Sequence, residues 1–230
     1  MREIISKCQL SLLPLADPSR AQAMRAYMKN RFEFMGIPAP DRRKACVDII
    51  RQLKTADANE LLQIATGLWA CEEREYQYLA VDMLAKHYRR LRLEDMPALL
   101  ALVQQKSWWD TVDGLAGIVG DLLRQNLTGN RGIQNGMDKA LEHPDFWVRR
   151  IALLHQLGWC EQTDVNRLFN YALALADEKE FFIRKAIGWA LRDYAWHDPA
   201  AIQSFLQENQ GRFSRLTQRE AAKNLGKLGK

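Results

Sequence analysis

Apolar residues recur along this chain at the spacing of helices, and no stretch alternates apolar and polar residues as a strand would. Cap residues or early prolines precede the periodic segments at Asp17-Pro18, Ala39-Pro40, Asp57, His143-Pro144-Asp145 and Asp198-Pro199. Glycines mark helix ends or turns at Gly36, Gly129, Gly158 and Gly211. The pattern predicts an all-α chain of about a dozen helices joined by short loops.

Several of the predicted helices are similar to one another. Residues 146–152 align with residues 181–187 at a spacing of 35, and residues 75–81 and 108–113 occupy similar places 30 to 40 residues apart. Paired helices at this period predict an α-solenoid of about six HEAT-like pairs, one domain of residues 1–230 curved around a concave groove. Asp113, Arg150 and Lys185 then fall at comparable positions of successive repeats and would converge on that groove. A compact helical bundle is the alternative.

Two of the predicted helices carry a second stripe away from their apolar face. In residues 181–194 the apolar face consists of Ile183, Ile187, Ala190, Leu191 and Tyr194. The stripe roughly opposite consists of Phe182, Lys185, Trp189 and Arg192. Trp109 and Asp113, one turn apart, likewise lie off the apolar face of their helix. Aromatic rings beside charges favour a binding surface, although packing and solvated charge are the ordinary alternative.

The other tryptophans are expected to pack in the core or between repeats. They are Trp69, Trp108, Trp147, Trp159 and Trp196.

Charge is unevenly placed along the 230 residues, whose formal net charge is +5. Residues 1–50 hold nine Lys and Arg against five Asp and Glu, and residues 201–230 hold six against two. The ends could therefore contact a polyanion, although solvated helix faces and a basic tail would look the same. The four cysteines and four histidines are scattered, so we expect no metal, no disulfide and a reducing cytoplasm. No signal peptide or membrane-spanning segment is indicated, and no membrane partner is expected.

Three blocks of sequence carry a family resemblance. They are Lys106-Ser107-Trp108-Trp109-Asp110-Thr111-Val112-Asp113, Phe146-Trp147 with Arg150, and the segment 179–192 that contains Phe181-Phe182-Ile183 and Lys185-Ala186-Ile187-Gly188-Trp189. The segment from Ala26 to Gly36-Ile37, followed by Pro40 and Arg42-Arg43, matches as well. With these residues the chain resembles the bacterial HEAT-repeat DNA alkylation repair proteins of the AlkD type, over residues 25–223. One departure is Ile37-Pro38-Ala39-Pro40, which replaces more polar residues at two positions near the DNA.

The resemblance implies a monofunctional DNA glycosylase of base excision repair. It would remove N3- and N7-alkylated purines, such as 3-methyladenine and 7-methylguanine, from double-stranded DNA without flipping the base. The catalytic residues it implies are Asp113, Trp109 and Trp189. The residues we expect to contact DNA are Arg150, Lys185, Arg192, Phe181, Phe182, Tyr27, Lys29, Arg42, Arg43, Lys44 and Lys106, together with the basic tail 212–230. We expect a bacterial, cytoplasmic monomer that associates with the nucleoid when bound to DNA and needs no cofactor.

The expected chemistry suits a single carboxylate. An N3- or N7-alkylated purine is cationic and leaves as a neutral base, so no general acid is needed. A fixed anion such as Asp113 would stabilise the sugar cation and orient water. The indole faces of Trp109 and Trp189 would contribute roughly 0.5–2 kcal/mol each. The alternatives are a non-catalytic HEAT-repeat protein that binds damaged or branched DNA, and a protein-binding scaffold.

Overall fold

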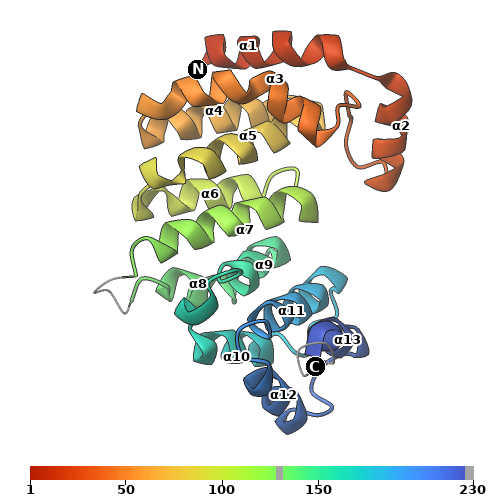
Figure 1. Cartoon of the computed structure of the whole chain (residues 1–230), viewed down its shortest axis with the longest axis vertical. Coiled ribbons are helices and arrows are strands. Elements are labelled where there is room, and N and C mark those ends of the chain that lie inside the picture. Colours follow the sequence, from red (N-terminus) through yellow and green to blue (C-terminus); the bar gives the residue numbers. More distant parts are fainter. Residues whose placement is uncertain (128–131, 226–230) are drawn as a thin grey trace. The chain divides into compact units, whose positions relative to one another are not determined.

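The computed structural model describes residues 1–127 and 132–225, and their regular structure is helical (Figure 1). In these two ranges there are 13 α-helices and no strand, apart from one isolated bridge between Glu33 and Glu73. The helices are α1 (Arg2–Leu12), α2 (Pro18–Tyr27), α3 (Ala39–Gln52), α4 (Ala58–Ala70), α5 (Arg74–His87), α6 (Met96–Val103), α7 (Trp109–Arg124), α8 (Asn135–Ala140), α9 (Phe146–Leu154), α10 (Val165–Ala174), α11 (Phe181–Tyr194), α12 (Pro199–Glu208) and α13 (Arg215–Ala221). The all-α prediction is confirmed, and the succession of packed helices is consistent with an α-solenoid.

The chain divides into two compact units, Met1–Leu102 and Val103–Lys230. In the first unit α1 packs on α3 and α4, and α5 packs on the same two helices. In the second unit α7, α9, α11 and α13 pack in succession, with α8 and α10 against α9 and α12 against α11 (Figure 1). A single domain of residues 1–230 and its assignment to HEAT repeats remain predictions. Within the described residues, no helix combines the length and apolarity that crossing a membrane requires.

The helices that begin at regular intervals share one register. α3, α5, α7, α9 and α11 start 35, 35, 37 and 35 residues apart. The fifth residues of these helices are Arg43, Tyr78, Asp113, Arg150 and Lys185. The last three are the ones for which comparable repeat positions were predicted from sequence.

Four of the five predicted helix starts are confirmed by side-chain caps, and the fifth, at Ala39-Pro40, is the start of α3 without such a cap. The carboxylates of Asp17, Asp57, Asp145 and Asp198 accept hydrogen bonds from backbone N–H groups in the first turns of α2, α4, α9 and α12. Such caps satisfy N–H groups that have no partner inside the helix. Gly36, Gly158 and Gly211 adopt positive φ, as helix stops and turns require. Gly129 lies outside the described residues.

The apolar faces of α7 and α11 are buried as predicted, and their second stripes are half-exposed. Trp69, Trp147 and Trp159 are buried, and Trp108 packs against other rings, which agrees with the packing expected for them. The packing prediction for Trp196 is wrong. Its side chain is 62% exposed, because α11 ends at Tyr194 and the turn that follows carries the indole away from the apolar face.

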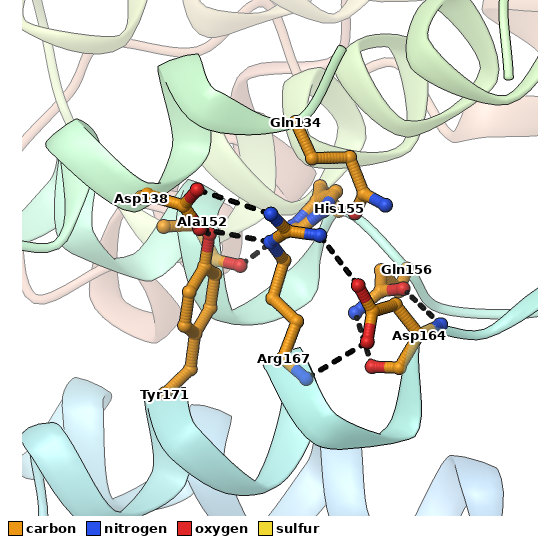
Figure 2. A network of polar contacts seen from close by, with 8 residues as sticks. All are labelled: Gln134, Asp138, Ala152, His155, Gln156, Asp164, Arg167 and Tyr171. Carbon is orange, nitrogen blue, oxygen red and sulfur yellow. Dashed lines mark hydrogen bonds and ion pairs between the residues drawn. The ribbon is translucent and has the colours of Figure 1, made fainter. Parts of the chain in front are cut away.

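A polar network lies between α8, α9 and α10 in the second unit (Figure 2). Asp138 accepts from Arg167 through two nitrogens, at 2.8 and 3.0 Å, and from the Tyr171 hydroxyl. The ring of His155 is completely buried beside it, with its nitrogens 2.7 Å from the Ala152 carbonyl and 2.8 Å from the Gln134 side chain. A neutral imidazole ring has one N–H donor and one nitrogen that accepts. Because the Ala152 carbonyl can only accept, Nδ1 donates to it, and we expect the Gln134 amide to present its nitrogen to Nε2. Burial lowers the pKa of His155 to about 4.

This buried histidine predicts a pH dependence of stability. Above pH 6.5 the ring is neutral in both states, whereas between pH 6.5 and 4 only the unfolded chain takes up the proton. Folding stability is therefore lost as pH falls through that window, by about 3 kcal/mol from this group. Urea unfolding of the wild type and of His155→Gln at several pH values measures it. Between pH 6.5 and 4, His155→Gln should lose less folding stability than the wild type, by the amount attributed to His155. His197→Gln, which replaces an exposed ring, should lose as much stability as the wild type.

A close approach of α7 to α9 requires glycine at position 120. A Cβ atom there would lie 2.0 Å from the backbone carbonyl oxygen of His155, so the helices would have to separate. We expect Gly120→Ala to lower the free energy of unfolding by about 1–3 kcal/mol. Gly117→Ala on the same helix is the matched control, because a Cβ at Gly117 meets nothing within 4 Å. That control should stabilise the protein by about 0.5–1 kcal/mol, and equal urea midpoints for both variants would contradict the packing argument.

Candidate active site

An ion pair between α7 and α9 lies at the centre of the site. The Nε and Nη2 atoms of Arg150 donate to the two carboxylate oxygens of Asp113 at 2.7 and 2.9 Å. The side chain of Arg150 is 5% exposed and that of Asp113 is 18% exposed. The remaining nitrogen, Nη1, donates to the carbonyl of Phe182 at the start of α11. One guanidinium therefore connects α7, α9 and α11 and fixes the direction of the carboxylate.

The electrostatics of Asp113 combine two opposed effects. Burial raises the pKa of Asp113 above its ordinary value, and the Arg150 guanidinium opposes that rise. Asp110, one turn earlier, adds a smaller effect in the raising direction. A carboxylate has about four lone-pair sites, and the two bonds to Arg150 use two of them. The partly exposed side chain therefore keeps acceptor capacity for a group that approaches from solvent.

Aromatic rings pack around the starts of α7, α9 and α11. Phe182 lies 4.9 Å from both Trp108 and Trp147, measured between ring centroids. Phe182 also faces the Arg150 guanidinium at 6.0 Å, so its ring helps to hold the cation in place. Phe181 meets Phe182 edge to face at 5.3 Å, and its own side chain is exposed. Of the two phenylalanines, Phe181 is thus the more exposed, and Phe182 is the one that packs against the two tryptophans.

The two candidate tryptophans lie on the half-exposed stripes. Trp109 is the first residue of α7, one turn before Asp113 on the same face. Gly117, one turn after Asp113, is exposed and has open space where a side chain would be. Trp189 lies seven residues beyond Phe182 on α11, about 10 Å along the axis. That Trp109, Asp113 and Trp189 meet on one ligand stays a prediction.

The cations of α11 have an acidic partner that was not anticipated. Lys185 and Arg192 both bind the carboxylate of Glu220 on α13, at 2.9 and 2.8 Å. Lys223 binds the same carboxylate at 2.7 Å. The predicted cationic stripe is therefore a cluster built on one buried acid. Lys106, in the segment before α7, is exposed and has a positive φ.

The first unit holds five of the predicted DNA contacts, namely Tyr27, Lys29, Arg42, Arg43 and Lys44. Arg42 is buried, with its guanidinium 3.0 Å from Asp82 and 4.9 Å from the centre of the Tyr78 ring. Arg43 shares Asp82 at 3.2 Å, but its side chain is largely exposed. Arg42 is therefore enclosed by protein atoms, whereas Arg43 is accessible to a ligand. Exposed residues of this set are Tyr27, Lys29, Arg43 and Lys44.

No grouping of three or more His, Cys, Asp and Glu side chains that could hold a metal ion occurs in residues 1–127 and 132–225.

Comparison with known proteins identifies the family. A family model described as DNA alkylation repair enzyme matches residues 8–225. The chain belongs to the DNA alkylation repair enzyme family. A solved structure of a predicted DNA alkylation repair enzyme from Enterococcus faecalis is 35% identical, with a TM-score of 0.86, over 92% of this chain and 97% of that one. No curated protein matches the chain.

In this member of the DNA alkylation repair enzyme family, two acidic partners of the predicted DNA-binding cations were not predicted from the sequence. Glu220 is the clearest, because it organises two of the predicted DNA-binding cations. It follows Lys185 by 35 residues, which is the spacing already found between residues 146–152 and 181–187, so the period could have pointed to it. Asp82, the partner of Arg42 and Arg43, had no such signal.

Proposed function

We propose that this chain is a monofunctional DNA glycosylase that removes cationic N3- and N7-alkylated purines, such as 3-methyladenine and 7-methylguanine, from double-stranded DNA. The observation that carries the proposal is Asp113, a largely buried carboxylate fixed through both oxygens by Arg150. Membership of a DNA alkylation repair enzyme family supports the substrate class. The product would be an abasic site for base excision repair.

The proposed reaction breaks the bond between C1′ and the base nitrogen. The electron pair of that bond goes to the base, which loses its positive charge and leaves neutral. Positive charge passes to the sugar, where the Asp113 carboxylate stabilises it. Water adds to C1′ and gives up a proton, for which the free lone pairs of Asp113 are an acceptor. Asp113 must be ionised for both tasks, and Arg150 favours the ionised form.

The surroundings of Asp113 support hydrolysis at the C1′ atom of a nucleotide that stays in the duplex. Trp109 precedes Asp113 on its face of α7, and Gly117 follows it and leaves the surface open. An indole face beside a cationic nucleoside contributes roughly 0.5–2 kcal/mol. A substrate that already carries the charge of its leaving group needs little more, so no extraction of the base into a pocket is proposed.

The remaining cations would hold the DNA backbone. In the second unit these are Lys106, Lys185 and Arg192, with Phe181 as an exposed ring. In the first unit they are Lys29, Arg43 and Lys44, with Tyr27. Phosphate contacts of this kind are salt-dependent and indifferent to sequence. We assign Arg150 and Arg42 to positioning instead of phosphate contact, because both guanidinium groups are buried and bound to carboxylates.

We further propose that the chain acts as a monomer and that its helical pairs form a HEAT-type array around a concave DNA-binding groove. The register of α3, α5, α7, α9 and α11, which start 35 to 37 residues apart, supports the array. The basic tail was expected to contact DNA too. Its residues 226–230 lie outside the described part of the chain.

Base release from a defined duplex tests the proposed function. Purified protein is incubated at low salt with a duplex carrying one 7-methylguanine, and abasic sites are scored by alkaline cleavage. We expect cleavage at the lesion in every sequence context, and none in an unmethylated duplex. Binding without release would favour the non-catalytic reading. Failure to retain any duplex at low salt would favour a protein-binding scaffold.

A further inference from the structure

The carboxylate of Glu220 gathers three cations from two segments of the chain. Lys185 and Arg192 reach it from α11, and Lys223 reaches it from the turn that follows α13. The four side chains lie within ion-pair distance, at 2.7 to 2.9 Å from nitrogen to carboxylate oxygen. The Glu220 side chain is 5% exposed, whereas those of Lys185, Arg192 and Lys223 are 36%, 23% and 47% exposed. The acid is thus covered by its three cations, which face solvent.

The charges of this cluster do not cancel. Three cations on one carboxylate leave two positive charges without an anion among these four groups. Although burial alone would raise its pKa, Lys223 and Lys185 lower the pKa of Glu220 to about 2, so the carboxylate is ionised at neutral pH. Two positive charges displayed by partly exposed Lys and Arg side chains are suited to an oxyanion, and a phosphate group is the usual one.

Close packing of α11 against α13 fixes the place of this acid. A Cβ atom at Gly188 would lie 2.5 Å from the Cβ of Glu220 and 2.8 Å from the carbonyl oxygen of Thr217, so glycine permits the contact. The hydroxyl of Thr217 also donates to the carbonyl of Arg184 at 3.1 Å. Trp189, the neighbour of Gly188 in sequence, lies on the same stripe of α11 as Lys185 and Arg192. The cluster therefore has a rigid base next to a proposed catalytic residue.

We propose that Glu220 is a positioning residue that holds Lys185, Arg192 and Lys223 together as a binding site for a phosphodiester of the DNA backbone beside Trp189. The inference rests on the proposed function, because it places the strand at that tryptophan. Without the carboxylate the three cations would repel one another and move apart into solvent. Holding them in place beforehand reduces the conformational entropy lost on binding.

For the variant Glu220→Gln, the proposal predicts a change in DNA affinity opposite in sign to the change expected from net charge alone. Glu220→Gln makes the protein more positive by one charge, which by long-range attraction alone would strengthen DNA binding. If Glu220 organises the site, the same variant weakens binding. Glu208→Gln is the matched control, because it makes the same chemical change at an exposed position on α12.

The measurement is the affinity for an undamaged duplex as a function of NaCl concentration. Each phosphate contact contributes about −0.9 to the slope of log K against log salt. We expect Glu220→Gln to bind about tenfold more weakly, with a slope shallower by roughly one to two. Glu208→Gln should bind as the wild type or slightly more tightly. Unchanged or tighter binding by Glu220→Gln, with an unchanged slope, overturns the proposal.

A second pair of variants covers the case in which Glu220→Gln does not fold. Lys223→Gln and Lys139→Gln make the same chemical change at exposed lysines of the second unit, but Lys223 contacts Glu220, whereas Lys139 on α8 is outside the cluster and outside the set of predicted DNA contacts. Only Lys223→Gln should reduce the slope by about 0.9. Equal effects of the two variants overturn the site. Because the duplex is undamaged, the salt slopes test this site separately from base release. If the wild type releases base and the variants have wild-type slopes, this site alone is refuted. If the wild type releases no base and the slopes change as expected, the proposed function alone is refuted.

Discussion

Replacing Asp113 by Asn is expected to lower the rate of base release on the order of 10²–10³-fold while DNA binding is retained. The amide has the shape of the carboxylate but no charge with which to stabilise the sugar cation. Loss of a negative charge from a surface that meets phosphates should not weaken binding. Single-turnover release of 7-methylguanine, with duplex affinity measured in parallel, checks both parts.

Asp121→Asn is the matched control for this prediction. It makes the same change on the same helix, at an exposed position two turns further along α7. This control should release base at the wild-type rate. Because Asp113→Asn leaves Arg150 without its counter-charge, a thermal melt must show that the variant is folded at the assay temperature. A folded Asp113→Asn protein with wild-type release would refute the catalytic role of the carboxylate.

Replacing Arg150 by Met is expected to have the largest effect on stability. Removal of one partner from a buried ion pair costs about 3–5 kcal/mol, because the other charge stays buried without compensation. The contact of Arg150 with the Phe182 carbonyl is lost as well, and with it a connection between α9 and α11. The urea midpoint of unfolding measures this effect. The double variant Asp113→Asn with Arg150→Met should recover part of the loss, since the uncompensated anion is then absent.

The single variant Arg150→Met is also expected to shift the pH dependence of base release. Arg150 opposes the rise in the pKa of Asp113 that burial causes, so its loss leaves that pKa higher. A higher pKa means that the carboxylate becomes protonated at higher pH, and activity fails earlier as pH falls. The acidic limb of the rate profile should therefore move upward in pH for Arg150→Met. An unmoved limb in a folded variant would contradict the pairing as the control on Asp113.

Local features of this fold were predictable because local rules determine them. The caps at Asp17, Asp57, Asp145 and Asp198 depend on residues two or three positions apart. The buried face of α11 follows from the helical period alone. The packing prediction for Trp196 was wrong because this residue lies just beyond the end of α11, where the helical period no longer applies.

The partners of the charged residues were not predictable in the same way. Arg150 and Lys185 hold the same register position, yet one binds Asp113 on α7 and the other binds Glu220 on α13. The register shows which face a side chain occupies, but an ion pair depends on the distance between atoms on two packed helices. The sequence therefore indicated a charged, aromatic face, and only the spacing of 35 residues between Lys185 and Glu220 pointed to the buried carboxylate that organises its cations.

The fate of a labelled methyl group decides whether this protein removes the alkylated base whole. Duplex DNA carrying 7-methylguanine with an isotopic label in the methyl group is incubated with the wild-type protein, and the products are separated by mass spectrometry. We expect the label to leave in free 7-methylguanine, with one abasic site for each base released. Label transferred to a cysteine, of which Cys160 is exposed, or released as formaldehyde while guanine stays in the strand, would contradict it.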